Sequence, residues 1–204
     1  GDHRDLHVRS RRQRQMCIRD SYDDLIEKTD EKYRPSDIKR EREVVGRCLD
    51  ECYPIVSDWD TPLAYQHPIR LSLQGIEIPV IGFIDLRYPD VVRELKSSAR
   101  PRAGIVDDHA FQVATYAMAI RQESGAWPQA FVDYLTPSGM KSYQLKNGKR
   151  WVQEVVDTAA SIRALLERAQ DKDALCELIT PDYSNWLWRY RPNSLATAKE
   201  LFGE

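Results

Sequence analysis

The stretch Gly82-Phe-Ile-Asp85, followed by Val91-Val-Arg-Glu-Leu-Lys96, decides the fold of this chain. Its acidic residues stand beside apolar ones, which is typical of strands rather than of exposed loops. Glu94 and Lys96 are two residues apart, so on a strand their side chains point to the same face. An aspartate, a glutamate and a lysine that meet on a sheet can hold a divalent cation and activate a water.

The same three side chains have a simpler interpretation. Asp85, Glu94 and Lys96 could form a cross-strand ion pair on a solvated face of the sheet, and such surface pairs are common and weak.

Composition places the chain among soluble globular proteins. Of its 204 residues, 42% are hydrophobic and 30% are charged. No apolar run approaches the roughly 20 residues that a membrane helix needs, so we expect no membrane partner. The net charge of -2 excludes a uniformly basic surface, so contact with nucleic acid would need a local basic patch.

The cysteines indicate the compartment. No two of the four cysteines form a C-x-x-C pair, since they stand at Cys17, Cys48, Cys52 and Cys176. We interpret them as reduced thiols and expect a cytoplasmic protein.

The first 21 residues do not resemble the start of a fold. Residues 11–21 have few apolar positions, and Met16-Cys-Ile-Arg-Asp-Ser21 resembles the translation of a transposase adapter used in sequencing libraries. We interpret residues 1–21 as adapter-derived or disordered, and 22–204 as one domain that lacks its natural N-terminal part. The alternative is a basic arm for nucleic acid.

Hydrophobic periodicity predicts helices on either side of a group of strands. The expected elements are a helix from 36 to about 56, strands 63–73, 76–86 and 91–97, a helix from 107 or 108 to about 124, strands 129–135 and 141–145, and a helix from 149 to about 170. This order predicts an α/β fold with a mixed sheet flanked by helices.

The ends and faces of the helices can also be predicted. Ser36 or Asp37 would cap the first helix and Asp107 or Asp108 the second. We expect Gly125 to end the second helix. The long last helix should bury one stripe of apolar side chains: Trp151, Val155, Ile162 and Leu166.

Three motifs in order resemble the PD-(D/E)xK nuclease superfamily, and within it the RecB-like group of CRISPR-associated and phage exonucleases. The first is the hairpin Gly75-Ile-Glu-Ile-Pro-Val-Ile-Gly-Phe-Ile-Asp85, which ends in the aspartate. The second is the E-x-K of Glu94-Leu-Lys96, and the third is the Q-x-x-x-Y of Gln112-Val-Ala-Thr-Tyr116. The similarity covers about residues 37–166.

The resemblance implies a restriction-endonuclease-like core and a metal-dependent DNA exonuclease of phage or bacterial recombination, repair or CRISPR-type processing. Asp85, Glu94 and the carbonyl of Leu95 would bind Mg²⁺ or Mn²⁺. Lys96 would position the attacking water, stabilise charge on the phosphate, or act as a base. A recombination or CRISPR-associated protein would be a partner, and the oligomeric state stays open.

The resemblance also assigns roles outside the carboxylates. Gln112 and Tyr116 share a helix face and would hold the catalytic residues or contact DNA. His109 lies on nearly the same side, and we interpret it as a surface residue. Contacts to DNA are expected from residues at and after the active strand: Ser97, Arg100 and Arg102.

The chain departs from this group in two ways. Many RecB-like nucleases complete the metal site with a histidine or glutamate on an early helix, and we expect that element upstream of residue 22. Part of the group holds an iron–sulfur cluster with one early cysteine and three near the C-terminus. Only Cys176 lies in the tail here, so we expect no cluster. The alternatives are a non-catalytic nucleic-acid-binding or scaffolding module and a restriction-type endonuclease.

Overall fold

The core of the molecule is a five-stranded mixed sheet in the order β1-β2-β3-β4-β5. The computed structural model describes residues 26–27 and 33–203, so the prediction for residues 1–21 lies outside the described residues. The strands are β1 (Ala64–Leu71), β2 (Val80–Arg87), β3 (Val91–Ser97), β4 (Gln129–Thr136) and β5 (Gly139–Gln144).

The sheet contains one parallel pair of neighbouring strands. β3 and β4 run parallel, whereas β1–β2, β2–β3 and β4–β5 are antiparallel. A parallel pair needs a crossover connection, and helix α3 (Asp107–Ser124) supplies it. The predicted α/β class is therefore confirmed, and the arrangement is consistent with a restriction-endonuclease-like core.

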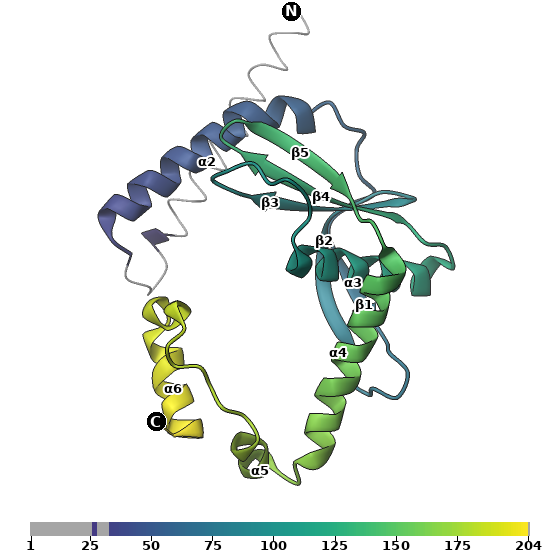
Figure 1. Ribbon diagram of the computed structural model, residues 1–204. Helices are drawn as coiled ribbons and strands as arrows, with labels where there is room; N and C mark the ends of the chain where they lie inside the picture. Colours follow the sequence, from purple (N-terminus) through teal and green to yellow (C-terminus); the bar gives the residue numbers. More distant parts are fainter. Residues whose placement is uncertain (1–25, 28–32, 204) are drawn as a thin grey trace, which may run out of the picture.

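Helices cover both faces of the sheet (Figure 1). Helix α2 (Pro35–Val56) lies against β4 and β5. The Sγ atoms of its buried Cys48 and Cys52 lie 3.8 Å and 3.6 Å from the carbonyl oxygens of Leu135 and Thr136. Helices α3 and α4 (Gly148–Arg168) pack together on the other side.

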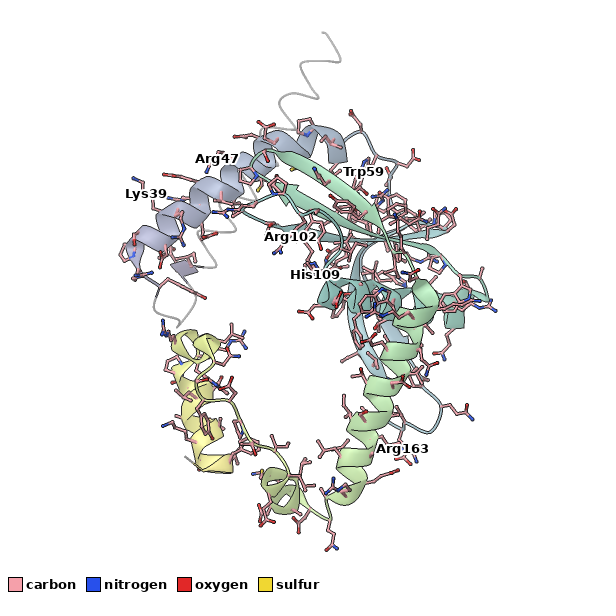
Figure 2. All side chains as sticks on the ribbon, viewed as in Figure 1. Lys39, Arg47, Trp59, Arg102, His109 and Arg163 are labelled. Atoms are coloured by element: carbon pink, nitrogen blue, oxygen red, sulfur yellow. The ribbon has the colours of Figure 1, made fainter. Side chains whose placement is uncertain are left out.

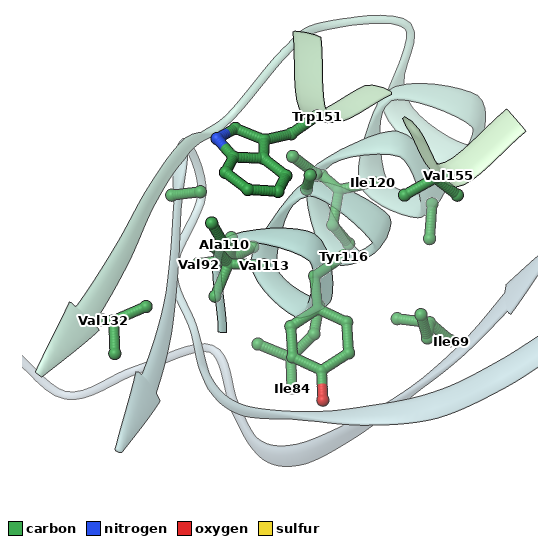
Figure 3. Packing of buried hydrophobic residues seen from close by; sticks show 14 of the residues in the cluster. Ile69, Ile84, Val92, Ala110, Val113, Tyr116, Ile120, Val132, Trp151 and Val155 are labelled. Atoms are coloured by element: carbon green, nitrogen blue, oxygen red, sulfur yellow. The ribbon is translucent and has the colours of Figure 1, made fainter. Parts of the chain in front are cut away.

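The main hydrophobic cluster lies between the sheet and α3 (Figure 3). Val92 and Val132 enter it from β3 and β4, and Trp151 and Val155 close it from the first turns of α4. The cluster fixes α3 over the sheet, so the polar side chains at the margin of this helix are held at a defined place.

Most predicted elements are present, with corrections at their ends. The return strand begins at Val80 rather than at Ile76, since Pro79 cannot donate to a ladder. Helix α2 starts from Arg34 with Pro35 in its first turn, and no side chain caps it. The N-cap of α3 is Val106, also without a side-chain cap. The caps predicted at Ser36 or Asp37 and at Asp107 or Asp108 are therefore wrong.

The end of α3 agrees with the prediction. Gly125 takes a left-handed conformation with φ of 80°, and its N–H donates to the carbonyl of Arg121. A left-handed C-cap costs glycine little because glycine has no Cβ.

The second half of α4 differs from the prediction. Ile162 and Leu166 are 55% and 42% exposed, because only the first turns of α4 lie over the main cluster. The helix then extends away from the sheet (Figure 1). It leads to α5 (Lys172–Glu177), the 3₁₀ helix η1 (Trp186–Tyr190) and α6 (Pro192–Phe202). No helix among the described residues is both long and apolar enough to span a membrane.

Candidate metal centre

Asp85 lies where strands β2 and β3 separate. The two strands pair at Leu86–Arg93 and Arg87–Val92, and Asp85 is the next residue of β2 beyond these pairs. Its Oδ2 accepts a hydrogen bond of 2.8 Å from the backbone N–H of Leu95. The Asp85 side chain thus links β2 to β3 by a hydrogen bond where the backbone pairing ends, and this bond holds it beside the E-x-K motif.

Glu94 lies under α3 and is only 5% exposed. Its Oε1 lies 2.7 Å from Nζ of Lys96 and accepts a hydrogen bond of 2.9 Å from Nε2 of Gln112. Its Oε2 is also buried, and within residues 33–203 it has no hydrogen-bond partner. One oxygen of this carboxylate is therefore saturated while the other can still accept a ligand.

The burial of Glu94 excludes the solvated ion pair. Loss of water raises the pKa of Glu94, and the nearby Asp85 raises it further, whereas Lys96 acts in the opposite direction. Buried polar atoms are normally hydrogen-bonded, and an unpaired one costs free energy. The structure therefore keeps the Glu94 carboxylate, with Asp85 nearby, in a place that disfavours its charge.

Gln112 and Tyr116 connect this site to the core. Nε2 of Gln112 donates to Oη of Tyr116 at 2.7 Å as well as to Glu94, so both hydrogens of the amide are used. The Tyr116 ring lies against β2, where a Cβ added to Gly82 would be 3.4 Å from its Cε1. Burial raises the pKa of Tyr116, so its hydroxyl stays neutral.

Gln66 of β1 is a residue that sequence reasoning missed. Its side-chain amide donates to Oδ1 of Asp85. Its backbone has φ of 48°, a left-handed conformation that glutamine rarely adopts and that costs about 1–3 kcal/mol. A polar residue in a strand is a weak signal, and the loop between β1 and β2 does not fix the register that brings Gln66 opposite Asp85.

The predicted DNA contacts lie at the end of β3 and on the loop that follows it. Ser97, Arg100 and Arg102 are all exposed. The loop is held by its backbone, since the hydroxyl of Ser98 donates to the carbonyl of Arg100 and that of Tyr143 to the carbonyl of Arg102. The two arginine side chains are thus carried on an anchored loop, and their contact with DNA stays a prediction.

His109, which the sequence indicated as a surface residue, is partly exposed and also makes a specific side-chain contact. Its Nδ1 lies 2.8 Å from Oη of the buried Tyr134, and that hydroxyl also accepts from the N–H of Val106. Burial lowers the pKa of His109, and the charges of Lys96 and Arg102 lower it further. Figure 2 shows His109 and Arg102 close together near the start of α3.

The two carboxylates fit a hard cation. Residues 26–27 and 33–203 contain no group of three or more His, Cys, Asp or Glu side chains that could hold a metal ion. Mg²⁺ commonly binds through one or two carboxylates and keeps several waters. Asp85 and the bare Oε2 of Glu94 supply that donor set, whereas the carbonyl of Leu95 stays a predicted ligand.

Comparisons with known proteins add little to this geometry. No protein-family model matches the chain, and no curated protein matches it significantly. Among solved structures, a candidate exonuclease from Eubacterium rectale matches 76% of this chain at 16% identity and a TM-score of 0.47. The structure of SSO0001 matches 58% of it at 17% identity and a TM-score of 0.35. The chain covers 59% of the length of each.

Proposed function

We propose that this protein is a metal-dependent nuclease that hydrolyses phosphodiester bonds in DNA, acting as an exonuclease. The observation that supports this most is the carboxylate of Glu94, which is buried, bound on one oxygen by Lys96 and Gln112, and bare on the other. Such a carboxylate destabilises the fold unless something binds it.

Each residue of the site has a separate task in this proposal. Asp85 and Glu94 would hold the cation through their carboxylates, with Oε2 of Glu94 free to bind it. Gln112 fixes the rotamer of Glu94 from α3, and Tyr116 fixes Gln112. The chemistry that Mg²⁺ or Mn²⁺ supplies in such a site is Lewis acidity toward the scissile phosphate and the attacking water.

Lys96 acts next to the cation. Its ammonium is held by Oε1 of Glu94 and is partly exposed, so it faces both the carboxylates and solvent. From there it orients the attacking water and stabilises the negative charge that develops on the phosphate oxygens. The oxygen of water bonds to phosphorus and gives up a proton to solvent, the bond from phosphorus to the leaving oxygen breaks, and the leaving oxygen takes up a proton from solvent.

The test is hydrolysis of end-labelled single- and double-stranded DNA with Mg²⁺, with Mn²⁺ and with EDTA. We expect cleavage only with the metals, and a fall in rate of about 10²–10³-fold in Lys96→Ala, the size seen when one charge-stabilising donor is removed. The matched control is Lys141→Ala, an exposed lysine on β5, which should cleave at the parent rate.

Three results separate this proposal from its alternatives. Activity that survives both EDTA and Lys96→Ala would contradict it. DNA binding without cleavage at any metal concentration would favour the non-catalytic module. Cuts at fixed sites in circular DNA, which has no ends, would favour a restriction-type endonuclease over an exonuclease.

A further inference from the structure

Gln66 stands directly opposite the metal-site aspartate. The register between β1 and β2 pairs Tyr65 with Leu86 on one side and His67 with Ile84 on the other. Gln66 and Asp85 fill the position between these pairs. The register is the same before and after them, so no residue is inserted and a bulge does not explain the unusual backbone of Gln66.

The left-handed backbone of Gln66 needs a local reason. Glycine, asparagine and aspartate tolerate this conformation, and glutamine does not share their advantage. The same residue has a backbone φ of 48° and a side-chain amide that donates a hydrogen bond to Oδ1 of Asp85. A strained backbone persists only where the surroundings compensate for it, and such residues cluster at functional sites.

The contact completes a clamp on Asp85. The N–H of Leu95 donates to Oδ2 and the amide of Gln66 donates to Oδ1, so each oxygen receives one hydrogen bond from a different strand. Each oxygen keeps a further lone pair for a ligand. The two donors also offset the repulsion between Asp85 and the nearby carboxylate of Glu94, which acts on the pKa of Glu94.

We propose that Gln66 is the positioning residue of the metal centre: its strained conformation holds the carboxylate of Asp85 in the orientation that binds the divalent cation. This inference rests on the proposed function, because it requires Asp85 and Glu94 to be the cation ligands. Gln66 itself acts through Asp85 rather than on the substrate.

The experiment measures cation binding, without DNA, in Gln66→Gly and Gln66→Met. Glycine relieves the backbone strain and removes the amide, whereas methionine keeps the length of the side chain and removes only the donor. Mn²⁺ is titrated into each protein by calorimetry, and urea unfolding in EDTA verifies the fold of each variant. Residues that orient metal ligands typically change affinity by about 10–100-fold, and we expect a loss of that size in both variants.

Asn147 supplies the matched control. It is the other non-glycine residue of the described chain with a positive φ, at 55°, and it lies at the start of α4 outside the metal centre. We expect Asn147→Gly to bind Mn²⁺ as tightly as the parent. We also expect Gln66→Gly to be more resistant to urea in EDTA although it binds Mn²⁺ more weakly, a combination that a merely structural role of Gln66 would not produce.

The outcomes distinguish the inference from the function on which it rests. Parent-like Mn²⁺ affinity in folded Gln66→Met or Gln66→Gly would overturn the role of Gln66 and leave the proposed function standing. Failure of the parent protein to bind Mn²⁺, with the same result in Glu94→Gln, would overturn the proposed function and this inference together.

Discussion

The two faces of β3 carry two ion pairs of opposite character. On one face, Nη1 of Arg93 lies 2.8 Å and 2.9 Å from the two carboxylate oxygens of Asp133. The guanidinium also lies 4.4 Å and 4.5 Å from the ring centroids of Trp59 and Phe131. On the other face, Lys96 and Gln112 share a single oxygen of Glu94.

The difference between the pairs lies in how completely each carboxylate is satisfied. Both oxygens of Asp133 accept from Arg93. Oε2 of Glu94 is buried without a hydrogen bond from any described residue. Removing one partner of a complete buried pair strongly destabilises the fold. An incomplete pair lowers the stability of the fold, but it leaves one carboxylate oxygen able to bind a ligand. Burial and charge alone therefore do not distinguish the two carboxylates, whereas the unsatisfied Oε2 of Glu94 does.

The largest expected effect tests the complete pair. Arg93→Ala removes the ion-pair partner of the buried Asp133 carboxylate, so we expect the free energy of unfolding to fall by about 3–5 kcal/mol. Urea unfolding followed by circular dichroism measures this. Arg100→Ala, at an exposed arginine, is the control and should stay within about 0.5 kcal/mol of the parent. A loss below about 1 kcal/mol in Arg93→Ala would remove the contrast between the two faces.

A smaller effect of opposite sign is expected at the incomplete pair. Glu94→Gln keeps the shape and removes a charge that burial disfavours, so in EDTA near pH 8 the variant should be as stable as the parent or more stable, by up to about 1 kcal/mol. The measurement is urea unfolding of both proteins between pH 4 and pH 8.

The pH dependence gives this prediction its sign. Because the pKa of Glu94 is raised in the folded state, the parent loses stability as pH rises from the ordinary pKa of glutamate through the raised one. The amide introduced by Glu94→Gln does not titrate, so the advantage of this variant should open across that window and vanish below it. An advantage that grows as pH falls would contradict the raised pKa.

The smallest expected effect concerns His109, beside the incomplete pair. Its pKa is lowered by burial, Lys96 and Arg102, against an opposing contribution from Asp108. The unfolded chain therefore binds the proton more readily, and stability falls as pH drops from the ordinary pKa of histidine through the lowered one. His109→Gln should lose this dependence, a change below about 1 kcal/mol because the ring is partly exposed. Parallel stability curves for the two proteins between pH 5 and pH 8 would contradict it.

The motif-bearing segment was the most predictable part of the molecule. The range predicted for β3, residues 91–97, is confirmed, because Val91 and Val92 begin it and turn residues stop it at both ends. Spacing on α3 also predicted that Gln112 and Tyr116 lie together. Local periodicity was sufficient for these, since each relation spans only a few residues.

The partners of the site could not be predicted in the same way. The contact of Gln66 with Asp85 depends on the register of a hairpin with an irregular loop. The bond between His109 and Tyr134 joins residues on α3 and β4. The exposure of Ile162 depends on how far α4 extends past the sheet. Each is set by tertiary packing, which overrides local pattern.

The order of the site residues along the chain has a consequence for how the candidate metal centre is assembled. Asp85, Glu94, Lys96 and Gln112 all come from one uninterrupted segment that runs from β2 into α3. Bringing them together closes only short loops, which carry a small entropic cost. The carboxylates, the lysine and the amide of the candidate metal centre are thus local in sequence, and the contact of Asp85 with Gln66 ties this segment to β1.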